Sequence, residues 1–184
     1  RASFDWGPDN TKCMKSKLLE VQKPCYRRTI EYYGFPITGG NYGYHVMKFW
    51  MVLIKPGNTQ PYIYADKSKE KVEAEKEKIE KEARKKETTT TTKPIAPRTL
   101  NQYHMAYQRY VLFADDRCVL TGAYNSTGRV SCSLWVKESA VDNPLYHCRM
   151  MLLAFCLNPS YNAYKYEAAT CKDMDKLNIP KYDH

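Results

Sequence analysis

Five cysteines in the last third of the chain constrain its fold more than any other feature. They are Cys118, Cys132, Cys148, Cys156 and Cys171. Their spacing does not form the paired C-x2-C pattern of a zinc site, so a disulfide framework is the better interpretation. Such a framework indicates an oxidising compartment, and we therefore expect a secreted, extracellular protein. The whole chain has seven cysteines, and this odd number leaves one thiol over, or bridged to another chain.

Much of the chain alternates between apolar and polar residues, as β-strands do. The segment 44–55 is apolar on both alternating faces, which is typical of a barrel wall with a lined interior and a covered exterior. The fold is therefore predicted to be mainly β, with antiparallel strands. Strands are predicted over 13–22, 25–33, 44–55, 61–65, 100–113, 118–124, 128–137 and 161–171.

Two segments have helical patterns instead. Lysine and glutamate alternate over 66–87, where pairs such as Glu77 and Lys81 support a solvated helix, and the threonines and prolines that follow predict an extended linker. The segment 66–98 is interpreted as an insertion into a single domain spanning 1–184. Because its apolar stripe is thin, we expect the insertion to be mobile. It is either a solvated spacer or an arm that binds a partner. That stripe consists of Val72, Ile79 and Ala83.

The second helix is predicted to begin at Asp142-Asn143-Pro144, which supplies a capping side chain and a proline in the first turn. One face of this helix is apolar, so it is expected to pack against the outside of the sheet. The residues of that face are Leu145, Cys148, Leu152 and Phe155.

Composition excludes several classes of function. The net charge is +9, yet there is no nucleic-acid-binding motif, and no apolar run reaches the length of about 18 residues that a membrane span needs. Neither nucleic acid nor membrane is expected as a partner. The four histidines are scattered and no G-x-S-x-G or H-E-x-x-H motif is present, so we expect no enzyme, metal or cofactor. Asn125-Ser-Thr127 is a predicted glycosylation site.

Four spaced elements carry a resemblance to a known family. They are Asp115-Asp-Arg-Cys118, Cys132-Ser-Leu-Trp-Val136, Asn143-Pro-Leu-Tyr-His-Cys148 and Tyr164-Lys-Tyr-Glu-Ala-Ala-Thr-Cys171. In this order they resemble the tick salivary lipocalins, the histamine-binding protein family. The resemblance implies an eight-stranded antiparallel β-barrel around a ligand cavity, with a C-terminal helix packed outside. The segment 6–13 looks like the family's turn between its first two strands, so most of the first strand would precede Arg1.

The same resemblance implies a pairing of the cysteines. The implied bridges are Cys118–Cys148, Cys132–Cys156 and Cys13–Cys171. Cys25 is then the unpaired residue, although Cys25 in place of Cys13 stays open as an alternative for the last bridge.

The chemistry of the ligand follows from two departures from the family pattern. Amine-binding members carry acids at the positions that Val119 and Ser133 occupy here, and a buried amine without a carboxylate partner costs several kcal/mol. Arg109, by contrast, is predicted to share a strand face with Tyr107 and Phe113. A guanidinium among aromatic walls suits the carboxylate of a fatty acid or eicosanoid.

The sequence thus predicts a secreted salivary lipocalin that sequesters a small host mediator, suppressing host inflammation or haemostasis. An anionic lipid is the favoured ligand. Histamine or serotonin, held by Asp5 or Glu31, is the alternative, and a protein-binding immunomodulator with the barrel as scaffold is another. The predicted ligand-binding residues are Asp5, Trp6, Tyr107, Arg109 and Trp135.

Overall fold

A computed structural model describes residues 11–35, 41–56, 60–87, 107–124, 130–141, 146–156 and 163–184. Within these ranges nine strands form one sheet. The strands are β1 (Thr11–Lys15), β2 (Leu18–Gln22), β3 (Cys25–Gly34), β4 (Gly43–Ile54), β5 (Tyr62–Asp66), β6 (Tyr107–Ala114), β7 (Cys118–Tyr124), β8 (Val130–Val136) and β9 (Lys181–Asp183).

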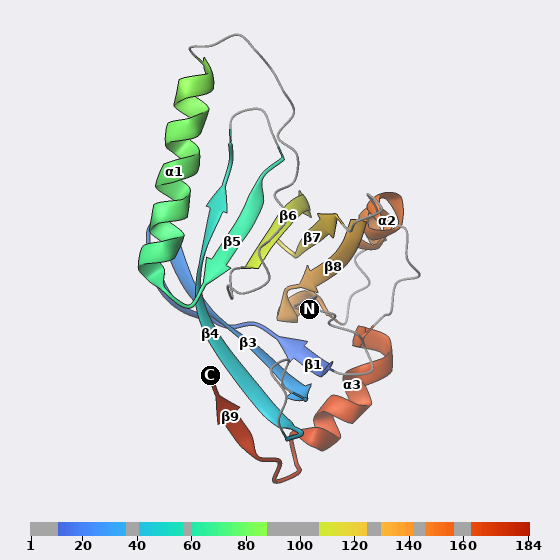
Figure 1. The fold of residues 1–184 in the computed structure, drawn as a ribbon. Helices are drawn as coiled ribbons and strands as arrows, with labels where there is room; N and C mark the ends of the chain where they lie inside the picture. Colours follow the sequence, from blue (N-terminus) through green and yellow to red (C-terminus); the bar gives the residue numbers. More distant parts are fainter. Residues whose placement is uncertain are drawn as a thin grey trace.

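The sheet follows the chain in an antiparallel meander. Its strand order is β1-β3-β4-β5-β6-β7-β8, with β2 beside β3 and β9 parallel to β4. Figure 1 shows that this sheet is curled, with α1 and α2 at its opposite sides. The predicted mainly β fold with antiparallel strands is confirmed. The predicted barrel is a curled half-barrel in the described residues, because β1 and β8, at the two ends of the strand order, do not pair with each other.

The predicted strand over 13–22 is two strands, β1 and β2, which share the same neighbour. Both pair with β3, and the chain bends between them at Ser16 and Lys17. Thr29 holds this bend, because its backbone N–H donates to the Lys17 carbonyl (2.9 Å) and its Oγ1 accepts the Lys17 N–H (3.1 Å).

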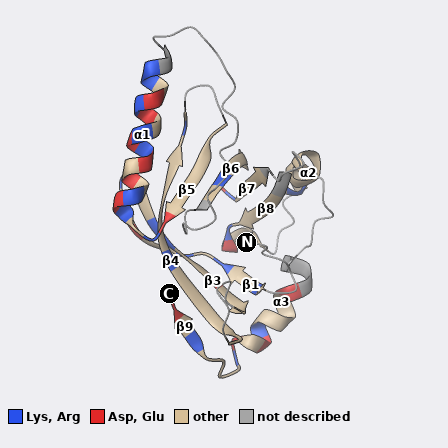
Figure 2. Ribbon diagram, in the orientation of Figure 1, with Lys and Arg blue, Asp and Glu red and all other residues tan. Residues whose placement is uncertain are grey.

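The charged helix α1 (Lys69–Glu87) packs against the sheet through its first turns. Ser68 caps it, since its Oγ accepts the Lys71 backbone N–H at 3.3 Å. Val72 is fully buried, and the Lys69 ammonium lies 5.5 Å from the centre of the Trp50 ring. Figure 2 shows the alternating basic and acidic bands along the rest of the helix. The expected helix is confirmed, but it is anchored in the core rather than fully solvated.

Helix α2 (Tyr146–Phe155) packs against β7 and β8. Its predicted start at 142–145 lies outside the described residues. Cys148 is buried and Leu152 is half-buried, as the apolar stripe predicts. Phe155 is 47% exposed, so its predicted packing on the sheet is wrong. Phe155 is the last residue of α2. The next residue, Cys156, attaches this end of the helix to β8 through its disulfide with Cys132.

The predicted last strand over 161–171 is wrong, because the chain forms helix α3 (Ala163–Met174) there. Glu167 and Cys171 are four residues apart and so share one helix face. Both hold β1: Glu167 Oε2 accepts the Cys13 backbone N–H at 2.7 Å, and Cys171 bonds to Cys13. Lys12 adds an ion pair of 3.5 Å with Glu167.

All three predicted disulfides are present. They are Cys13–Cys171, Cys118–Cys148 and Cys132–Cys156. Cys25 is the free cysteine of the described chain and is completely buried under α1. The alternative that paired Cys25 with Cys171 is therefore wrong. Helices α2 and α3 are thus each bonded covalently to a strand.

Candidate functional site

The two faces of the sheet differ in what covers them. Side chains alternate between faces along a strand, and paired residues of neighbouring strands share a face. By this rule Val52, Tyr62 and Tyr110 lie on the face that α1 covers, and Cys118 and Leu134 lie on the same face under α2. The opposite face, on which none of the described helices packs, is called here the helix-free face.

The helix-free face is predominantly apolar across seven strands. The register of paired residues places its members opposite one another, from Tyr26 and Met51 to Val119 and Trp135. Six of its principal side chains are half-buried, whereas Leu18, Val21, Tyr26 and Leu53 are exposed. Its principal side chains are Leu18, Val21, Tyr26, Met51, Leu53, Ile63, Arg109, Val111, Val119, Thr121, Ser133 and Trp135.

Arg109 lies near the middle of this face. It pairs with Ile63 of β5 and is only 8% exposed, and Thr121 beside Val111 is 3% exposed. An arginine is seldom this buried unless it has partners, and Arg109 does make contacts within the chain. Its guanidinium carries five N–H donors in a planar fork.

The prediction that Phe113 shares a strand face with Arg109 is wrong. A bulge between Val111 and Phe113 lets Phe113 pair with Leu120 while Val111 pairs with Thr121. The extra residue turns Phe113 to the helix-covered face, where it packs beside Cys118 and contacts the His147 ring. The alternation along β6 therefore carries Arg109 and Val111, but not Phe113, on the helix-free face.

The two positions that bear acids in amine-binding members are on the helix-free face. Val119 pairs with Trp135, and Ser133 pairs with Thr121, whose hydroxyl donates to the Ser133 carbonyl at 3.4 Å. Trp135 is half-buried. The structure thus brings Arg109, Trp135 and these two positions to one face, and the four are contributed by β6, β7 and β8.

Several predicted residues cannot be placed. Asp5, Trp6 and the glycosylation site Asn125 lie outside the described residues. Tyr107 begins β6 opposite Ala65, and its side chain is not described. Of the five predicted ligand-binding residues, Arg109 and Trp135 are therefore the two whose side chains the structure locates.

Glu31 lies on the helix-covered face, opposite Val46, and is only 4% exposed. Tyr44 donates its hydroxyl to Oε2 at 2.5 Å, Thr29 donates to Oε1 at 2.8 Å, and the Lys17 ammonium lies 3.2 Å from Oε2. Burial raises the pKa of Glu31, but these hydrogen bonds outweigh it and leave the pKa lowered. The carboxylate has its partners in the fold and does not face Arg109.

A row of rings occupies one end of the helix-free face. His45 stacks between Tyr32 and Tyr182, with ring centres 5.4 and 5.1 Å away. His45 Nε2 must donate to the Gly34 carbonyl oxygen (3.2 Å), so Nδ1 accepts from Nε2 of His184 at 3.0 Å. Burial lowers the pKa of His45. The neutral form of His45 thus joins the C-terminal strand β9 to β4.

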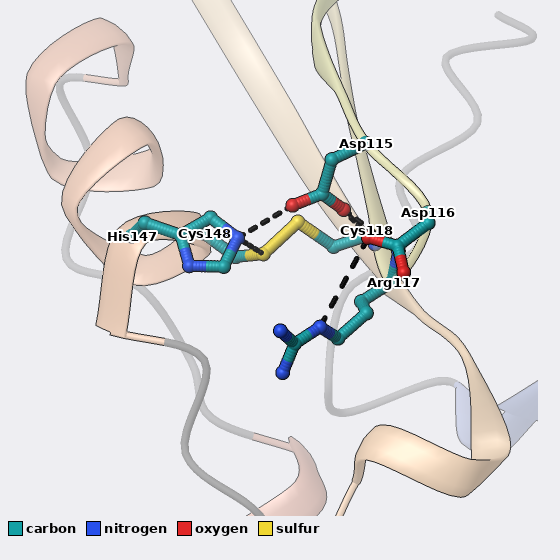
Figure 3. The surroundings of a disulfide bond; sticks show 6 residues. All are labelled: Asp115, Asp116, Arg117, Cys118, His147 and Cys148. Atoms are coloured by element: carbon teal, nitrogen blue, oxygen red, sulfur yellow. Dashed lines mark hydrogen bonds and ion pairs between the residues drawn. A yellow bond between two sulfur atoms is a disulfide. The ribbon is translucent and has the colours of Figure 1, made fainter.

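The polar cluster beside the Cys118–Cys148 disulfide links α2 to the turn between β6 and β7 (Figure 3). Asp115 Oδ1 accepts the backbone N–H groups of Cys118 and Arg117, both at 2.7 Å, and His147 Nε2 donates to Oδ2 at 2.5 Å. The backbone hydrogen bonds, first that of Cys118, lower the pKa of Asp115 to about 2, and the bond from His147 adds to them. Metal-ligating atom types cluster here, but the two sulfurs are bonded to each other and cannot coordinate as thiolates.

A surface hollow of about 470 Å³ lies along α1, away from the helix-free face. Its walls carry both signs of charge, and it contains no member of the predicted site. The partner-binding role of the segment 66–98 stays a prediction. The hollow is lined by Ala74, Glu77, Lys78, Lys81, Glu82 and Lys85.

These features define the described chain as a disulfide-linked β protein whose curled antiparallel sheet has a predominantly apolar, helix-free face that includes the buried Arg109. The three disulfides are those that the resemblance to tick salivary lipocalins implies. The resemblance implies an eight-stranded barrel, and the described residues form a curled sheet of nine strands. No protein-family model matches the chain, and no curated protein matches it. Among solved structures, the chain is similar to Japanin from Rhipicephalus appendiculatus bound to cholesterol, with a TM-score of 0.49 and 14% sequence identity over 82% of this chain and 79% of that one.

Proposed function

We propose that this protein is a secreted, non-enzymatic lipocalin of the tick salivary type that binds a small anionic lipid on its helix-free face. The observation that carries the proposal is Arg109, a buried guanidinium in the middle of an apolar face. The three disulfides support secretion, since such bridges persist in oxidising compartments. Sequestering a host fatty acid or eicosanoid would follow from this binding.

The chemistry of the face favours a carboxylate over an amine. A fatty acid has a long apolar chain, which suits Ile63, Val111 and Trp135, and one carboxylate, which suits a guanidinium fork. The positions that would hold an amine are the neutral Val119 and Ser133. Of the two other candidate acids, Asp5 lies outside the described residues, and Glu31 is engaged by Lys17 on the opposite face.

Calorimetric titration with arachidonate, histamine and serotonin tests the proposal. We expect arachidonate to bind and the amines to bind at least tenfold more weakly. A charge-assisted hydrogen bond contributes about 1.5–3 kcal/mol, so Arg109→Gln should weaken arachidonate binding by about ten- to a hundredfold. Arg109→Lys should recover part of the loss, because it keeps the charge without the fork.

Two controls make the result interpretable. Arg149→Gln removes an exposed arginine of α2 and should leave binding unchanged. Thermal unfolding of Arg109→Gln checks that the buried substitution leaves the protein folded. Tight histamine binding that is insensitive to Arg109→Gln would contradict the proposal and favour the amine alternative.

A further inference from the structure

The hairpin of β2 and β3 exposes four large apolar side chains close to one another. Leu18 is 50% exposed, Leu19 and Val21 are each 48% exposed, and Tyr26 across the turn is 38% exposed. A strand that served only the fold would bury one of its two faces. In β2 both neighbouring leucines are exposed, so its apolar residues are not accounted for by the packing of the described residues.

Basic side chains surround these apolar residues. Lys17 is 62% exposed at its side chain, Arg27 is 43% exposed, and Lys23 is exposed at the turn. Two carboxylates belong to the hairpin: Glu20 lies 3.8 Å from Arg27, and Glu31, which is buried, lies 3.2 Å from Lys17. The hairpin therefore presents an apolar centre with a net positive rim.

We propose that this hairpin docks the protein on the surface of an anionic phospholipid bilayer. Apolar side chains that reach the boundary between headgroups and acyl chains, together with nearby lysine and arginine, are the combination that binds such a surface. Tyrosine suits the same boundary, because its ring is apolar and its hydroxyl is polar. The contact is peripheral, and no described helix is long and apolar enough to cross a membrane.

Charge selects the lipid surface over a second copy of the chain. A symmetric dimer through this hairpin would bring Lys23 and Arg27 toward their own copies, and like charges across a contact oppose binding. An anionic lipid surface can bury the leucines at its acyl boundary and attract the basic rim through its headgroups.

The docked orientation would bring the helix-free face near the lipid. Leu18 and Val21 lie on that face through their pairing with Arg28 and Tyr26, and Tyr26 pairs with Met51. The hairpin and the proposed ligand site therefore lie on the same face of the sheet. The docking itself does not depend on the proposed ligand, because it uses the hairpin alone.

Sedimentation with vesicles tests the docking directly. Vesicles of phosphatidylcholine mixed with phosphatidylserine should bind the wild-type protein, and vesicles of phosphatidylcholine alone should bind it several-fold more weakly. The double variant Leu18→Ser/Leu19→Ser should lose at least about tenfold in partitioning, since it removes two apolar contacts. Lys23→Glu should weaken binding only to the anionic vesicles, and added salt should remove this difference.

Exposed leucines elsewhere provide matched controls. Leu153→Ser on α2 (64% exposed) and Leu177→Ser after α3 (63% exposed) should bind vesicles as the wild type does. Val21→Ser alone repeats the test should the double variant fail to fold. Wild-type protein that does not bind anionic vesicles, or an equal loss in the Leu153 and Leu177 variants, overturns the proposal. A concentration-dependent dimer that Leu18→Ser/Leu19→Ser abolishes, without vesicle binding, would assign the hairpin to a second copy instead.

Discussion

Replacing Val72 with alanine tests whether the charged helix α1 belongs to the folded core. Val72 is completely buried in a cluster with Cys25, Val52, Ile54 and Tyr62. A solvated spacer, the interpretation that the charge pattern favours, would make this residue dispensable. The structure instead makes it the main apolar contact between α1 and the sheet.

The expected loss follows from the buried volume that the substitution removes. Valine to alanine removes two carbon groups worth about 0.8 kcal/mol each on burial, or about 1.6 kcal/mol together. The cavity left between the helix and the sheet adds to this cost, so the free energy of unfolding should fall by about 2–3 kcal/mol. The same substitution at a solvated position would change it by less than about 0.5 kcal/mol.

Urea unfolding followed by circular dichroism measures this loss. Ile79→Ala should cost less than Val72→Ala, because Ile79 is only half-buried. Val141→Ala, at a valine that is 37% exposed, is the control and should have little effect. A loss at Val72 no larger than that at Val141 would refute the packing of α1 against the sheet.

Three further predictions concern the covalent and polar links of the fold. Cys171→Ser should lower the free energy of unfolding by about 2–5 kcal/mol in urea titration, because it opens the bridge to Cys13; an unchanged midpoint would contradict this. Asp115 has a lowered pKa of about 2, so its contribution is present above the ordinary carboxyl pKa and is lost as pH falls toward 2; Asp115→Ala should flatten the acid limb of the stability profile. His45 has a lowered pKa, so its contribution is present above the ordinary histidine pKa of about 6.5 and is lost as pH falls below it. His45→Phe should remove that part of the pH dependence in thermal unfolding, and a profile identical to the wild type would contradict the link to β9.

The strands were predictable because their pattern is local. Alternation locates β3, β4 and β7 within one or two residues, and the resemblance implied all three bridges that the structure contains. The same alternation misled over 161–171, where tyrosines two apart suggest a strand. The i, i+4 spacing of Glu167 and Cys171 is the signal of the helix. It can be interpreted only once the structure shows that both residues contact Cys13 of β1.

The candidate site was predictable only in part. Arg109 and Trp135 come from elements that the sequence identifies, and the register places both on one face. The turn of Phe113 to the other face depends on a bulge of one residue, which no periodicity reveals. The anchoring of Val72 was missed because a thin apolar stripe does not tell how deeply its members are buried.

A substitution that reverses the charge preference of the helix-free face tests the central claim most directly. Val119→Asp introduces a carboxylate beside Trp135, at a position that is acidic in the amine-binding members that the chain resembles. Calorimetric titration should show weaker binding of arachidonate, by about tenfold or more, and new binding of histamine. Leu177→Asp, an exposed position outside the sheet, should change neither affinity. Unchanged arachidonate binding in folded Val119→Asp would contradict the assignment of this face as the ligand site.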